Sequence, residues 1–491
     1  MSTGDPTEDT LSVAFPLPYR VLCLVGVGLL AWATNLHGLH RMEIDVVAAL
    51  DLRTEGYAPR LPLSNRRRPS FIGHRGLNAP ARSHTYMATP HFYRALYRVC
   101  AVYFAFCFIS WVLYRLASQN DPDLADKYGY IPAFTALIMV LLLLSPFDVF
   151  FKHERDKFHQ SVRRCFLSSS NTPVLFSDVI LADIGTSFAK VLGDVWLSLC
   201  MLIPGNSMLH PPPQLGLARW VIPTLMSLPY LARFRQCVIE YNLPSNESNR
   251  PLFNAIKYAT AFPVIYLSAA QGLVTAEVVK QRGLAAANEP WQGQHYIFRL
   301  WLLAVFVNSL YSFWWDVSND WGLDLLRSDM SLPQETRFPM RHTRPHPHPS
   351  TPLITEDMVA SAPEPPLELS SRLSEAPAYI PRSYPYGLRP VLLFPLVLYP
   401  ILIIINLMLR MSWTTKLATH LHASRDGSMT ILLLEISEIL RRWLWVFIRV
   451  EWEVVKKLSE GEPKEEPSSL NQSRSSLEIM PDDAPPPSLT D

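Results

Sequence analysis

Polar side chains recur at helical spacing inside an apolar stretch of the sequence. Asp183, Thr186, Ser187, Lys190 and Asp194 follow one another at intervals of three or four residues, which predicts one polar face on a single helix. Ionisable groups inside a membrane are costly and usually line an ion or substrate path. The plainer alternative is an ion-pair network of the two aspartates with Lys190 that only holds helices together.

Two carboxylates stand close together at the end of another apolar stretch. Asp316 and Asp320 are four residues apart in the aromatic segment YSFWWDVSNDWG, which begins at Tyr311, so one helix face carries both. Neighbouring carboxylates require cations or a shared proton. Alternatively, the aromatic residues are interfacial anchors and the acids lie at the cytosolic boundary, which is the position we expect for Asp320.

The last apolar stretch supplies cations that could bind an oxyanion. Glu438 and Arg442 are spaced to pair within one helix, whereas Arg441 has no obvious partner there. Guanidinium groups match phosphate oxygens with paired hydrogen bonds. If the fold brings them together, five cations would form an oxyanion site: Arg233, Lys257, Arg410, Arg441 and Arg442.

Several other classes of chemistry lack their residues in this chain. There is no GxSxG, HExxH, Walker lysine loop or CxxC pair, so we expect no enzyme and no catalytic residues. The six cysteines lie mostly in apolar runs, and we expect no disulfide framework, cofactor or metal site. A net charge of +1 with 49% hydrophobic residues also argues against a nucleic-acid partner.

The elements that must position these residues are long apolar runs in a chain of 491 residues. About 20 apolar residues in a helix cross about 30 Å of hydrocarbon. The sequence therefore predicts an all-α polytopic membrane protein embedded in the lipid bilayer, with about nine transmembrane helices. The predicted spans are 15–39, 92–116, 131–151, 177–203, 217–241, 254–275, 295–317, 388–410 and 429–450.

Charge and composition between the runs predict the topology and the domain limits. The Arg-rich loop 41–90 belongs on the cytosolic side and the acidic loop 121–130 on the other, so the N-terminus is luminal and the C-terminus cytosolic. We expect five segments: a luminal tail at 1–14, transmembrane helices at 15–175, a domain at 176–455, a flexible cytosolic linker at 328–385 within it, and a disordered cytosolic tail at 456–491.

Five ordered blocks resemble the EXS-domain family, whose members include eukaryotic phosphate exporters. The blocks are ADIGTS from Ala182, PYLARFRQC from Pro229, NAIKYATAF from Asn254, YSFWWDVSNDWGL from Tyr311 and EILRRWLWVFIRVE from Glu438. The SPX sensor domain of the full-length exporters is missing, and the segments FPLPYR from Phe15 and AWATNLHGL from Ala31 resemble the short fungal ER-retention-defective subgroup. The resemblance implies a phosphate pathway made by Asp183, Thr186, Arg233, Lys257, Tyr258, Asp316, Asp320, Arg410, Arg441 and Arg442.

The resemblance also implies a function. We expect a multi-pass Golgi-membrane, or else ER-membrane, protein that moves inorganic phosphate from the lumen to the cytosol and supports glycosylation and the retention of resident proteins. The alternatives are a non-transporting sorting factor that recruits the machinery recycling Golgi glycosyltransferases, and a phosphate exporter at the cell surface. A homodimer is considered as well, and gating by inositol pyrophosphates through an SPX-type site is not expected.

Overall fold

The computed structural model describes most of the apolar part of the chain. The described residues are 13–50, 81–148, 151–203, 205–209, 216–282, 295–325, 388–411 and 428–460, without 43, 45, 324, 390 and 391, together with residue 212. Within them every regular element is a helix, which confirms the all-α class. The predicted linker at 328–385 lies outside the described residues, as does most of the tails and of the Arg-rich loop.

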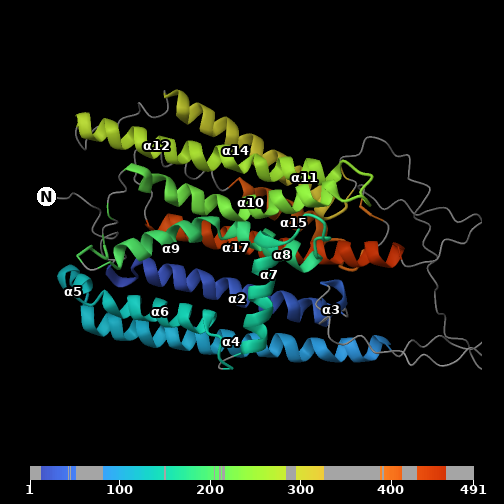
Figure 1. Ribbon diagram of the computed structural model, residues 1–491, viewed down its shortest axis with the longest axis horizontal. Coiled ribbons are helices and arrows are strands. Elements are labelled where there is room, and N and C mark those ends of the chain that lie inside the picture. The colour runs from blue at the N-terminus through green and yellow to red at the C-terminus, as the bar shows by residue number, and fades with distance from the viewer. Residues whose placement is uncertain are drawn as a thin grey trace, which may run out of the picture. The chain divides into compact units, whose positions relative to one another are not determined.

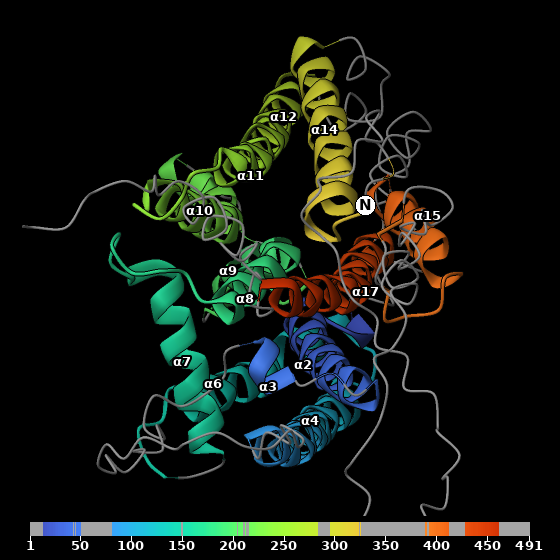
Figure 2. The same cartoon turned by 90° about the vertical axis from the view of Figure 1, so that its right-hand side faces the viewer.

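The N-terminal helices form one side of the bundle in Figures 1 and 2. They are α2 (Leu17–Arg41), α3 (Val46–Ala49), α4 (Ala81–Ser118), α5 (Pro122–Lys127) and α6 (Tyr130–Leu144). Helices α2 and α4 pack along each other, and the hydroxyl of Tyr19 donates to the carbonyl of Ser110 at 3.1 Å. Helix α4 begins about ten residues before the predicted span.

Helix α7 (Lys152–Leu167) runs across the direction of its neighbours (Figure 1). Arg155 donates to the carbonyls of Ser145 at 2.9 Å and Phe147 at 3.0 Å, and both residues lie just beyond the end of α6. At its other end, Arg164 makes two hydrogen bonds of 2.6 and 2.7 Å to the carboxylate of Asp178. Helix α7 is thus attached both to α6 and to the helix that follows.

The predicted fourth span is a bent pair, α8 (Phe176–Ser187) and α9 (Ala189–Met201), with an angle of 61° between them. The prediction of one continuous polar face from Asp183 to Asp194 is therefore wrong. The bend falls at Phe188, whose ring lies against Gly28 so closely that a β-carbon there would clash. A glycine in α2 thus makes room for the side chain at the bend.

The remaining helices complete the bundle around α17 (Ser428–Glu460). They are α10 (Val221–Asn242), α11 (Arg250–Ala259), α12 (Ala261–Arg282), α14 (Tyr296–Trp315), the π-helical turn η3 (Asp316–Asp320) and α15 (Leu398–Arg410). Helix α10 is continuous through Pro229, whereas the sixth predicted span is split at Thr260 into α11 and α12. Helix α17 continues to Glu460, beyond the predicted start of the disordered tail.

Buried apolar side chains join the two sides of the bundle through α17. Val21 and Leu24 of α2, Val191 of α9, and Leu432 and Ile439 of α17 form one core cluster. Figure 2 shows α17 between α2 and α14, in agreement with this cluster. Helix α17 is therefore held by apolar contacts on one face, while Arg442 contacts α8 and Arg441 contacts α15 and the turn after α14.

Four described helical segments are long and apolar enough to cross a membrane, and the bent pair α8–α9 would add a fifth. The four are Leu17–Arg41, Phe92–Ser118, Pro122–Leu144 and Tyr296–Asp320. Each of the nine predicted ranges contains a helix or a bent pair, but α11 has only 10 residues and α15 only 13. The number of nine crossings and the sidedness stay predictions.

Candidate functional site

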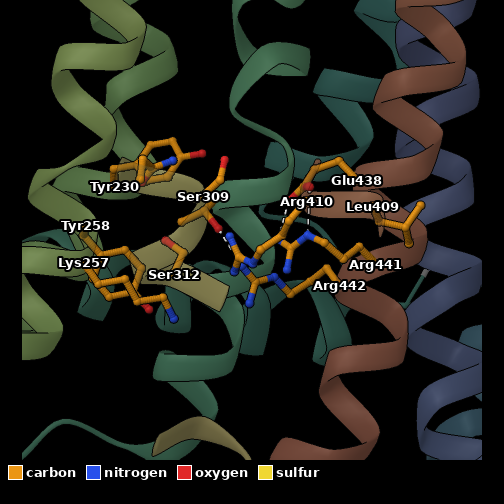
Figure 3. A pocket seen from close by; sticks show the side chains of 12 residues that line it. Tyr230, Lys257, Tyr258, Ser309, Ser312, Leu409, Arg410, Glu438, Arg441 and Arg442 are labelled. Carbon is orange, nitrogen blue, oxygen red and sulfur yellow. Dashed lines mark hydrogen bonds and ion pairs between the residues drawn. The ribbon is translucent and has the colours of Figure 1, made fainter. Parts of the chain in front are cut away.

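A cavity of about 160 Å³ lies inside the bundle, where six helices meet (Figure 3). One water needs roughly 10–15 Å³ of such volume, so the cavity has room for a small polyatomic ion. It is lined by Thr186 of α8, Tyr230 of α10, Lys257 and Tyr258 of α11, Asn308, Ser309 and Ser312 of α14, Leu409 and Arg410 of α15, and Glu438, Arg441 and Arg442 of α17.

The π-helical turn at the end of α14 places two aspartates around one lysine. The ammonium of Lys257 lies 3.0 Å from Oδ1 of Asp316 and 2.9 Å from Oδ2 of Asp320. The indole of Trp315 donates to the other oxygen of Asp320 at 3.1 Å. Asp320 is therefore buried and paired with Lys257, and its expected position at the cytosolic boundary stays a prediction. Asp316 is fully buried.

The second carboxylate oxygen of Asp316 contacts arginines from two other helices. Oδ2 accepts from Nε of Arg410 at 3.1 Å, and Nη1 of Arg441 lies 3.6 Å away from it. Nδ2 of Asn406 is 3.5 Å from the same oxygen. Opposite charges in close contact offset the cost of burial, so Asp316 stabilises three cations at the cavity wall, Lys257, Arg410 and Arg441.

Asp183 and Arg233, which do not line the cavity, form a compact buried group with Tyr258, which does. Nε of Arg233 lies 3.0 Å from Oδ1 of Asp183, and the hydroxyl of Tyr258 donates to the same oxygen at 2.5 Å. Arg233 also donates to Gln236 at 2.5 Å. Asp183 thus pairs with Arg233 and not with Lys190, which instead pairs with Asp194. The predicted Asp183–Lys190–Asp194 network is wrong in this respect.

Arg442 differs from the other cations because no carboxylate lies within ion-pair distance of it in the part of the chain that the structure describes. Its Nη2 donates to the hydroxyl of Thr186 at 3.0 Å, and Nε lies 3.3 Å from that of Ser187. Its Nη1 is buried and has no hydrogen-bond partner among the described residues. An unpaired buried guanidinium donor costs free energy unless a ligand pairs with it.

Glu438 contributes a carboxylate to the cavity. Its two oxygens accept from Nη2 and Nε of Arg441 at 2.5 and 2.9 Å, and Oε1 also accepts from the hydroxyl of Ser187 at 3.0 Å. The prediction that Arg441 lacks a partner in its own helix is therefore wrong, as is the pairing of Glu438 with Arg442. A planar two-point contact of this kind fixes the orientation of Arg441.

The ten residues predicted for the pathway lie in one connected region but have two different positions. Six of them line the cavity: Thr186, Lys257, Tyr258, Arg410, Arg441 and Arg442. Four do not line it: the carboxylates of Asp183, Asp316 and Asp320, which pair with cations, and Arg233, which pairs with Asp183. The prediction omitted Tyr230, Asn308, Ser309, Ser312, Leu409 and Glu438. On α14, Asn308 and Ser309 stand four and three residues before Ser312, which is a helical spacing and the signal that could have identified them.

The fold and this cavity define a class: a polytopic helical membrane protein with a cation-lined, polar chamber inside its bundle. The sequence pattern of the EXS family matches residues 15–455, so the chain belongs to the EXS family. The match begins just before α2 and therefore includes the N-terminal helices, which the sequence prediction placed before the domain.

Curated relatives are similar over much of the chain. Protein ERD1 homolog 1 of Schizosaccharomyces pombe is 27% identical over 68% of this chain and 71% of its own length. Protein ERD1 homolog 2 of the same organism is 26% identical over 89% of this chain and 95% of its own length. Phosphate transporter PHO1-2 of Oryza sativa subsp. japonica is 25% identical over 39% of this chain and 22% of its own length.

Proposed function

We propose that this protein is a transporter that moves inorganic phosphate through the central cavity, from the Golgi lumen to the cytosol. The observation that carries the proposal is that Arg442, whose buried Nη1 has no hydrogen-bond partner among the described residues, lines a cavity together with Lys257, Arg410 and Arg441. Buried donors of this kind are satisfied by an anionic ligand with several acceptor oxygens. Inorganic phosphate is such a ligand.

The charge balance around the cavity supports reversible binding. Five cations, Arg233 among them, meet four carboxylates, so the described residues of the site exceed neutrality by one positive charge when all are ionised. The carboxylates of Asp183 and Asp316 hold the cations in place without an anion present. A phosphate ion therefore finds a prepared site, yet one that does not bind it too tightly for release.

The named relatives support the choice of substrate and of compartment to different degrees. One relative bears the name phosphate transporter, and its similarity covers part of this chain. The Golgi location and the support of glycosylation rest on the sequence resemblance described above. Purified protein in phosphate-loaded proteoliposomes tests the proposal directly. We expect phosphate flux above that of phosphate-loaded vesicles without protein, and the absence of such flux would refute transport.

A further inference from the structure

Glu438 brings a negatively charged carboxylate to a site that we propose binds an anion. It is the one carboxylate among the described residues that line the cavity, and about a third of its side chain (37%) is exposed. A carboxylate beside an oxyanion is repulsive unless a proton lies between them. The residue therefore restricts which oxyanions can occupy the cavity together with it.

The hydrogen bonds of Glu438 leave room for one more donor. An ionised carboxylate offers about four acceptor positions on its two oxygens. Oε1 accepts from Arg441 and from Ser187, whereas Oε2 accepts from Arg441 alone. One position on Oε2 thus has no donor among the described residues. Figure 3 shows Glu438 beside Arg410 and Arg441 at the edge of the cavity.

No other described side chain around the cavity accepts hydrogen bonds without also donating them. Lysine and arginine only donate, while the hydroxyls of Tyr230, Ser309 and Ser312 both donate and accept. Only an ionised carboxylate accepts without donating. An oxyanion that carries a P–OH group can donate to Glu438, whereas a fully deprotonated one such as sulfate presents only acceptors and meets repulsion.

We infer that Glu438 is a specificity-determining residue that admits oxyanions carrying a proton, such as phosphate and arsenate, and excludes sulfate. The inference rests on the proposed function for its substrate class. It follows the general rule that specificity comes from an unfavourable contact with the wrong ligand as well as a favourable one with the right ligand. The single excess positive charge of the site also matches a singly charged oxyanion better than a dianion.

The experiment measures anion binding to purified full-length protein by calorimetry, with inorganic phosphate, arsenate and sulfate as probes, beside phosphate flux in proteoliposomes. The wild type should bind phosphate and arsenate and discriminate against sulfate by at least a hundredfold. In Glu438→Gln, whose amide can donate to an acceptor, the preference for phosphate over sulfate should fall at least tenfold. Glu438→Asp, which keeps the carboxylate, should still exclude sulfate.

The control is Glu435→Gln, one turn earlier on α17, where Glu435 lies 3.8 Å from Lys190 and does not line the cavity. It should keep the wild-type selectivity. Sulfate binding by the wild type as tight as phosphate binding would overturn the inference, as would unchanged selectivity in Glu438→Gln. Selective phosphate binding without flux would refute the proposed transport and leave the role of Glu438 supported. No binding of either anion would overturn both.

Discussion

Lys257 and Asp316 lie 59 positions apart in the sequence, yet the lysine ammonium is 3.0 Å from Oδ1 of the aspartate, and both are buried. The contact joins α11 to the turn after α14 and brings Lys257 to the wall of the cavity. Because Lys257 also pairs with Asp320, one cation serves two carboxylates. Its loss should affect both folding and phosphate transport.

Two variants separate those effects. Lys257→Met should lower the free energy of unfolding by roughly 3–5 kcal/mol, because Asp320 loses its charged partner. Adding Asp320→Asn should recover part of that stability, with a coupling of about 0.5–3 kcal/mol. Phosphate flux should stay lost in the double variant, since Lys257 lines the cavity. Thermal unfolding in detergent and flux in vesicles measure both; recovered flux in the double variant would contradict the role of Lys257.

The ion pair of Arg233 with Asp183 should contribute mainly to the stability of the fold. Arg233→Met leaves Asp183 buried with only the hydroxyl of Tyr258 and should cost roughly 3–5 kcal/mol. The matched control is Arg235→Met, two residues further along α10, where the guanidinium is half-buried and donates to Ser168. That change should cost about 1 kcal/mol. Equal melting temperatures for the two variants would show that the Asp183 pair is not a structural element.

Glu451 should influence transport without touching the cavity. It is fully buried, pairs with Arg389, and accepts from the backbone of Leu393 at 2.6 Å and the hydroxyl of Tyr399. Arg389 in turn donates to the carbonyl of Trp321, next to Asp320, at 2.6 Å.

Glu451→Ala leaves Arg389 without its carboxylate and should destabilise the start of α15 by about 3–5 kcal/mol. Phosphate flux should fall with it. The control Glu453→Ala removes a carboxylate that pairs within α17 with Arg449 and is not fully buried, so it should cost less stability than Glu451→Ala. A melting temperature and flux for Glu451→Ala equal to those of the control would argue against this link.

Gly322 occupies a position that only glycine fits. Its φ is +61°, and a β-carbon there would lie 2.5 Å from the ring of Trp452. Gly322→Ala should therefore lower the free energy of unfolding by more than about 1 kcal/mol. In Gly272→Ala, within α12, the added methyl meets nothing within 4 Å and should be neutral or stabilising by up to about 1 kcal/mol. Thermal unfolding of the pair decides this, and an unaffected Gly322→Ala would be inconsistent with the geometry.

Periodicity and residue type predicted the helical class, and the polar stripes with the family resemblance named the residues that meet around the cavity, but neither showed how they pair. Spacing shows which residues share a helix face, since it follows from 3.6 residues per turn. It contains no information on which faces meet. Spacing alone therefore predicted an ion pair of Asp183 with Lys190. The bend at Phe188 separates the two residues, and Arg233 of α10 is the partner of Asp183.

The partner of Arg441 shows a different limit. Both Arg441 and Arg442 are within reach of Glu438 by sequence, at three and four residues. The choice depends on tertiary contacts, because Thr186 and Ser187 of α8 accept from Arg442 and Asp316 attracts Arg441. Such a choice cannot be read from one helix alone. The hydroxyls of Ser309 and Ser312 were missed because serine is common in membrane helices without a polar path.

The central claim is that the cavity carries phosphate, and Arg442 offers the most direct test. Because no carboxylate among the described residues pairs with it, Arg442→Gln should fold, unlike changes that leave a buried acid unpaired. Phosphate flux should be measured in proteoliposomes for the wild type, Arg442→Gln and Arg449→Gln, the last lying two turns further along α17 and paired with Glu453. We expect flux to fall at least tenfold in Arg442→Gln alone. Wild-type flux in Arg442→Gln would contradict the assignment of the cavity.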